Sequence, residues 1–92
     1  MTVEVLPDLP TTAETPFGTT DESNIPFYTV RAGIPFEDAL VQIAVLLKCA
    51  GESSYELCDG GTPQRGLVWS TIHHIEAAQA LTDALIKGVS VR

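Results

Sequence analysis

Basic residues are scarce in this sequence. Five lysines and arginines stand against twelve aspartates and glutamates, which gives a formal net charge of -7 at pH 7. Nucleic acids and anionic membranes are bound by surfaces that neutralise phosphate, so a chain this acidic matches neither. We therefore expect no nucleic acid and no membrane among its partners, whereas the charge permits a cationic protein partner.

Long hydrophobic runs are also missing, and we expect no leader sequence. The chain begins MTVEVLP, without a basic region followed by an apolar segment. The charge-free stretches within its helical segments reach about half of the roughly 20 residues that a membrane-spanning helix needs. These absences predict a soluble, cytoplasmic protein.

Cysteine is rare as well. Cys49 and Cys58 are the two in the chain, too few for the disulfide framework of a small secreted protein. On one helix they would point to nearly opposite sides, at about 100° per residue, and could not bridge each other. We expect two free thiols.

Two long segments carry a helical pattern, and the four-residue break Gly60–Pro63 separates them. Helices joined by so short a turn must lie antiparallel. We predict one helix over about 35–59 and another over about 63–87. Residues 35–88 would then form an antiparallel two-helix hairpin, and the fold class is all-α.

The first helix is expected to start at Pro35, a residue suited to the first helical position. Gly51 is its weak point, because glycine costs about 1 kcal/mol relative to alanine inside a helix. We favour a continuous helix nonetheless. Its seam residues recur at spacings of four and three, the pattern of a helix packed along one side: Phe36, Leu40, Ile43, Leu47, Ala50, Ser54 and Leu57.

The second helix has a clear start and end. Thr62 is a good N-cap, Pro63 a good first residue, and Gly88 is expected to terminate the helix after Lys87. Two seams lie side by side along it. The first comprises Leu67, Thr71, His74, Ala78, Leu81 and Leu85, and the second comprises Val68, Ile72, Ile75, Gln79, Thr82 and Ile86.

These two seams form an apolar arc about 180° wide, whereas a single neighbouring helix covers roughly 100°. A two-helix hairpin is also too small to fold alone in the usual case. We therefore predict a homodimer in which two hairpins pack into a four-helix bundle. The expected dimer interface comprises Leu67, Val68, Ile72, Ile75, Leu81 and Leu85.

The N-terminal part of the chain is expected to lie outside the helical hairpin. Residues 1–25 hold three prolines and five acidic residues without any periodicity, which predicts a flexible, disordered acidic tail. Residues 26–34 combine aromatic and β-branched residues, which is typical of an extended segment or short strand. Such a strand would pair with a second copy or lie extended over the helices.

Two stretches resemble a group of small uncharacterised bacterial proteins that are frequent in pseudomonads. These are Phe27 to Leu40 (FYTVRAGIPFEDAL) and Leu67 to Glu76 (LVWSTIHHIE). The resemblance covers about residues 27–88 and leaves the acidic tail unmatched. It implies a bacterial source and a short, stand-alone helical protein classed as a domain of unknown function, and it implies no activity.

The sequence contains no catalytic or metal-binding spacing. His73 and His74 are adjacent, so they point about 100° apart on a helix, and neither has a second histidine four residues away. We expect His74 to be a hydrogen-bonded core residue and His73 to be exposed. A nucleophilic role for Cys58 lacks an orienting acid and an oxyanion loop. We predict no enzyme activity, no cofactor and no metal site.

Some residues do not fit the helical seams. Trp69 projects on the polar side of the second helix, beside His73 and Glu76, and an exposed tryptophan is a frequent contact anchor. Val41, Val45 and Cys49 form a narrow apolar stripe opposite the main seam of the first helix. Either Phe27 and Tyr28 cover this stripe, or the two patches mark a partner-binding surface.

We therefore expect a small non-enzymatic interaction or regulatory module that acts as a homodimer and contacts an unidentified protein partner. The alternative is a ligand or metal sensor whose site lies in the dimer core. His74, Gln79 and Cys58 are its candidate residues, because they are polar residues on otherwise apolar surfaces.

Overall fold

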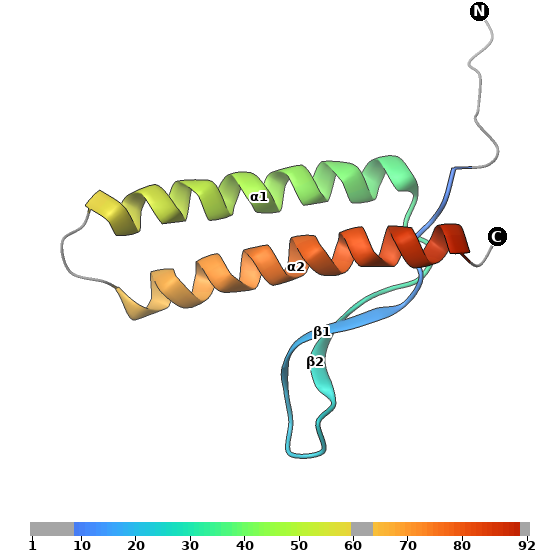
Figure 1. Cartoon of the computed structure of the whole chain (residues 1–92), viewed down its shortest axis with the longest axis horizontal. Coiled ribbons are helices and arrows are strands. Elements are labelled where there is room, and N and C mark those ends of the chain that lie inside the picture. Colours follow the sequence, from blue (N-terminus) through green and yellow to red (C-terminus); the bar gives the residue numbers. More distant parts are fainter. Residues whose placement is uncertain (1–8, 60–63, 91–92) are drawn as a thin grey trace, which may run out of the picture.

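The computed structural model describes residues 9–59 and 64–90. In chain order it contains strands β1 (Thr15–Thr20) and β2 (Pro26–Val30) and helices α1 (Phe36–Asp59) and α2 (Arg65–Ser90). The helices lie side by side and antiparallel, and the two strands form a hairpin on the other side of α2 (Figure 1). The fold therefore has the two predicted helices, but it also has an antiparallel sheet that the all-α prediction missed.

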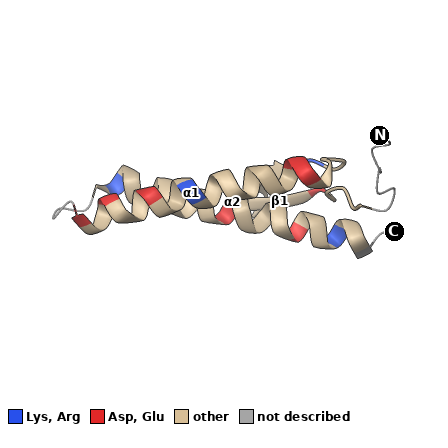
Figure 2. Cartoon of the chain, turned by 90° about the horizontal axis from the view of Figure 1, so that it is seen from above, with Lys and Arg blue, Asp and Glu red and all other residues tan. Residues whose placement is uncertain are grey.

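The molecule is a thin layer, with extents of 53 × 42 × 14 Å. Seen edge-on, α1, α2 and β1 lie close to one plane (Figure 2). Most domains bury their apolar residues between two packed layers. A single layer instead has two broad sides, so side chains that point to either side meet water unless something else covers them.

Helix α1 runs through Gly51 without a break, as the sequence pattern favoured. Its contact with α2 is centred on small residues, because Ala39 and Ala50 are buried and alanine lets two helix backbones approach closely. Leu40 and Leu47, which the predicted seam placed inside, are exposed beside this contact. The helix is thus rotated slightly relative to the predicted seam.

Helix α2 lies between two neighbours. Its first predicted seam packs against α1, and buries Thr71, Ala78, Leu81 and Leu85. A second flank, rich in alanine, packs against the hairpin and the segments that lead to it; its buried residues are Ala77, Ala80 and Ala84. The alanines keep this flank narrow enough for the strands and their connections to lie close to the helix.

The end of α2 differs from the prediction. The helix continues past Gly88 to Ser90, so Gly88 does not terminate it. Instead, the backbone carbonyl of Thr11 lies directly against Gly88, where any side chain would collide with it. The N–H of Ala13 also donates to the carbonyl of Ala84, at 2.9 Å. Gly88 therefore allows the segment around Thr11 to cross α2 at close range. The predicted start at Thr62 and Pro63 lies outside the described residues.

The β-hairpin has a tight loop and an irregular strand register. Residues Thr15 to Phe17 pair with Val30 to Tyr28, and a bulge follows before Thr20 pairs with Pro26. Gly18 sits in this bulge with φ of +87°, a conformation open chiefly to glycine. In the loop, the Asp21 carboxylate accepts hydrogen bonds from the N–H groups of Ser23 and Ile25.

The prediction of a disordered tail over residues 1–25 is wrong for its described part, residues 9–25; residues 1–8 lie outside the described residues. Thr12 is buried and makes four hydrogen bonds across the chain. Its N–H donates to the carbonyl of Ile34 and its carbonyl accepts from Gly33. Its hydroxyl donates to the carbonyl of Arg31 and accepts from the N–H of Ile34. These bonds attach the segment before β1 to the segment after β2, and β2 itself pairs with β1 of the same chain.

Candidate functional site

One broad side of the layer carries large apolar side chains from both helices. Leu47 of α1 is 53% exposed and Ile75 of α2 is 41% exposed. Leu40 lies two turns before Leu47 on the same side of α1. The residues that α2 contributes to this surface belong to its second predicted seam. We call this surface the open face; it comprises Leu40, Leu47, Val68, Ile72, Ile75 and Ile86.

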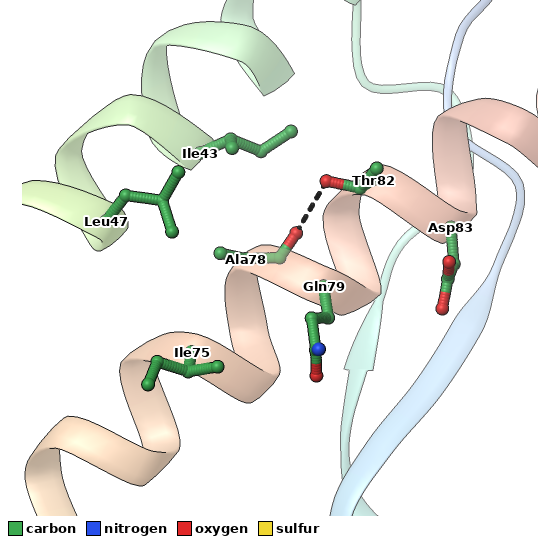
Figure 3. A pocket seen from close by; sticks show the side chains of 7 residues that line it. All are labelled: Ile43, Leu47, Ile75, Ala78, Gln79, Thr82 and Asp83. Atoms are coloured by element: carbon green, nitrogen blue, oxygen red, sulfur yellow. Dashed lines mark hydrogen bonds between the residues drawn. The ribbon is translucent and has the colours of Figure 1, made fainter. Parts of the chain in front are cut away.

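A groove of about 480 Å³ runs along the open face between the two helices. Ile43 and Leu47 border it on α1, and Ile75 and Ala78 border it on α2, while Gln79 points away from α1 (Figure 3). The hydroxyl of Thr82 donates to the carbonyl of Ala78 at 2.9 Å, so it does not require a water partner. The groove is thus largely apolar, with no strand residue in its lining.

The predicted dimer interface divides into two groups. Ile72 and Ile75 are exposed on the open face, and Leu67 and Val68 are half-buried. Leu81 and Leu85 are only 8% and 7% exposed, because the first seam of α2 packs against α1 of the same chain. These two leucines are therefore not available to a second copy.

A second surface feature lies where the hairpin meets the first half of α2. There Tyr28 stacks on Phe17 at 5.7 Å between ring centroids, and its ring lies 5.0 Å from that of His73. Beside these rings is a depression of about 380 Å³, which we call the notch. Its lining includes Gly18, Tyr28, Trp69, Ile72, His73 and Glu76.

The notch joins three of the predicted partner-binding residues, Trp69, His73 and Glu76, with Tyr28 of β2. The contributions of Phe17 and Gly18 were missed, because they lie in the segment that was predicted to be a tail. A weak sequence signal was present: Phe17 and the threonines of residues 15–20 suit a strand, and turn-forming residues separate them from the run at 26–30, but a proline and a glycine interrupt the pattern.

The other predicted partner-binding residues lie elsewhere. Val41 and Val45 are 63% and 48% exposed on the side of α1 that faces away from α2, and Cys49 is half-buried beside them. Phe27 and Tyr28 do not cover this stripe, since β2 packs against β1 and α2 and both aromatic residues are themselves exposed. The partner surface predicted from sequence is therefore two separate patches.

The residues of the sensor alternative lie on different surfaces. His74 is half-buried toward α1, Gln79 is exposed on the second seam of α2, and Cys58 is exposed at the end of α1. His74 was expected to be hydrogen-bonded, but its buried Nδ1 atom has no hydrogen-bond partner among the described residues. Within residues 9–59 and 64–90, no three histidine, cysteine or acidic side chains gather as metal ligands would.

Neither helix has the length and apolar character needed to span a membrane, as far as the described residues extend. The family described as "Protein of unknown function (DUF3077)" matches residues 11–88, and the chain belongs to this family. The match starts at residue 11 and so includes both strands, whereas the resemblance seen in the sequence began at residue 27. No curated protein and no solved structure matches the chain.

Proposed function

We propose that this DUF3077 protein is a small, non-enzymatic interaction module that acts as a homodimer, with the open face as its dimer interface. The observation that supports this is the exposure of Leu47 and Ile75, and of their apolar neighbours, on one side of a layer 14 Å thick. Contiguous apolar surface of this kind on a small chain marks an interaction site.

The open face has the size that a stable dimer needs. Helices of 24 and 26 residues are about 36–39 Å long and about 10 Å wide, so together they present roughly 700–800 Å². A standard protein–protein interface takes about 800 Å² from each partner. The two-helix face of each copy is therefore large enough for a dimer interface, and two such faces packed together form a four-helix bundle.

The chemistry of the open face also favours a second copy. The second seam of α2, from Val68 to Ile86, contains no charged residue, so two copies can meet through mostly uncharged surface despite the net charge of -7. Asp83 also lines the groove, and its carboxylate points away from α1 (Figure 3). The hydroxyls of Ser54 and Thr82 donate to carbonyls of their own helices, which removes their need for water. Burial of this surface would leave few polar groups without partners.

The proposal places the dimer in the cytoplasm, where the two free thiols would remain reduced. Ser70 and His73 both line the notch, but within the described residues no hydrogen bond joins the Ser70 hydroxyl to the His73 ring, whereas covalent catalysis requires a nucleophile bonded to its base. The role of the module is accordingly to present surfaces to other proteins.

The test is the mass of the protein in solution, measured by size-exclusion chromatography with light scattering. We expect the wild-type chain to elute as a dimer at low micromolar concentration. Ile75→Glu and Leu47→Glu each place a charge on the open face and should yield folded monomers, with helix content checked by far-UV circular dichroism. Val41→Glu is the matched control, since it adds the same charge to an exposed aliphatic position of α1 and should remain dimeric.

A wild-type chain that is monomeric and folded at these concentrations would reject the dimer. If Leu47→Glu and Ile75→Glu both remained dimeric, the copies would associate through another surface, and the assignment of the open face would be wrong.

A further inference from the structure

The notch brings aromatic rings and a carboxylate together at one point of the surface. Trp69, His73 and Glu76 follow one another at spacings of four and three along α2, so they share one side of the helix. Tyr28 reaches the same point from β2, and its ring lies 5.0 Å from that of His73. Two secondary-structure elements therefore fix the positions of these groups.

Gly18 allows Tyr28 to occupy this position. A Cβ atom at residue 18 would lie 3.0 Å from Cδ2 of Tyr28 and 3.9 Å from a carboxylate oxygen of Glu76. The absence of a side chain therefore keeps the ring close to the strand and leaves the approach to Glu76 open. The bulge at Gly18 in β1 therefore shapes the notch as well as the strand pairing of the hairpin.

The exposed groups of the notch are those that attract a cation. Trp69 is 60% exposed and Tyr28 is 49% exposed, and the faces of such rings attract positive charge. Glu76 is half-buried, and within the described residues it takes part in no ion pair or hydrogen bond. Arg65 lies one turn before Trp69 but is not among the residues that line the notch.

We infer that the notch binds the guanidinium group of an arginine side chain that a partner protein presents. A guanidinium is planar, stacks on aromatic rings and donates paired hydrogen bonds to a carboxylate, whereas a lysine ammonium is a more strongly hydrated point charge. The net charge of -7 attracts a basic segment at longer range. This inference rests on the proposed role as an interaction module and specifies the chemistry of its partner.

The test is an NMR titration of the ¹⁵N-labelled full chain with a short Gly/Ser peptide that contains a single arginine. Trp69 is the only tryptophan, so its indole N–H signal is unique in the spectrum, and the Gly18 amide gives a second reporter. We expect saturable shifts of both signals with the arginine peptide. A lysine peptide should bind more weakly, and a citrulline peptide, which has the same shape without the charge, should not bind.

Two substitutions connect the binding to the notch. Glu76→Gln should weaken the arginine peptide about tenfold, which is the effect of about 1.4 kcal/mol of lost charge-assisted interaction. Glu22→Gln, which neutralises an exposed carboxylate of the hairpin loop, should leave the affinity unchanged. Trp69→Ala, followed through the Gly18 amide, should abolish binding, whereas Tyr55→Ala on α1 should not.

Equal shifts with the arginine and citrulline peptides would overturn the inference, and so would wild-type affinity in Glu76→Gln. Free arginine that binds as tightly as the peptide would overturn the assignment to a protein partner. Light scattering on the same samples separates this inference from the proposed dimer. A dimer that ignores the peptide contradicts only the notch, and a monomer that binds it contradicts only the dimer.

Discussion

Gly51 and Gly88 both lie inside helices, yet their surroundings differ. Apart from the backbone of its own helix, a Cβ atom at Gly51 would meet no described atom within 4 Å, whereas at Gly88 it would collide with the backbone carbonyl of Thr11. Gly51 therefore contributes only the backbone freedom that weakens a helix. Gly88 provides the space through which the N-terminal segment crosses α2. The sequence pattern predicted Gly51 as the weak point of its helix and Gly88 as a helix terminus. It could not reveal the contact at Gly88, because the crossing segment lies more than seventy residues away.

The same substitution at these two glycines should therefore have opposite effects. Gly51→Ala should raise the free energy of unfolding by about 0.5–1 kcal/mol, since alanine restricts the unfolded chain and favours the helix. Gly88→Ala should lower it by about 1–3 kcal/mol, because the crossing segment must move to admit the methyl group. Urea unfolding followed by far-UV circular dichroism measures both. A stabilised Gly88→Ala would show that the two segments do not cross in contact.

Residues of the candidate site were predictable to different degrees. Trp69, His73 and Glu76 could be found in the sequence because they depart from the apolar seams of α2. Phe17 and Gly18 could not be placed beside them, because that requires the fold of the hairpin over the helix. The separation of Leu81 from Ile75 also required the structure, since both lie in one apolar arc and only the position of α1 distinguishes them.

Among the structural elements, the helices were predicted and the first strand was not. The helical seams repeat along 24 and 26 residues, which makes their periodicity clear. Strand β1 has six residues, with a proline and a glycine among them, so it shows no alternation of apolar and polar residues. Its burial comes from contact with α2 and its hydrogen bonds come from β2. Both are tertiary interactions that a local pattern does not contain.

Thr12 provides a direct test of how the N-terminal segment is attached. Thr12→Val keeps the shape of the side chain but removes the hydroxyl, so the carbonyl of Arg31 and the N–H of Ile34 each lose a hydrogen bond. Because these groups are partly buried, the free energy of unfolding should fall by about 1–3 kcal/mol. Amide hydrogen exchange should also accelerate at Ile34.

The matched control for that change is Thr19→Val, which alters an exposed threonine of β1 and should leave stability nearly unchanged. If Thr12→Val were as stable as this control, the segment before β1 would not be held by the Thr12 hydroxyl.

At the scale of the whole molecule, the single-layer shape explains why large apolar side chains lie on the surface and the core is small. In the described part of the chain no large side chain is fully buried, and the core cluster contains alanine at three of its six buried positions. Such a core supplies limited stabilisation, because burial energy grows with apolar area. The apolar groups of the open face represent the stabilisation that one copy leaves unused and that a second copy would recover.

Stability should consequently depend on protein concentration. If unfolding is coupled to separation of the two copies, a tenfold increase in concentration stabilises the folded dimer by about 1.4 kcal/mol, which corresponds to a rise in Tm of about 3–6 °C. Differential scanning calorimetry over about a hundredfold range of protein concentration, roughly 5 to 500 µM, measures how Tm depends on concentration. Ile75→Glu should show a lower Tm that is independent of concentration, while Val41→Glu should keep the wild-type slope. A wild-type Tm that stays constant over the whole range would mean that a single copy already has its full stability, and that the open face has another occupant.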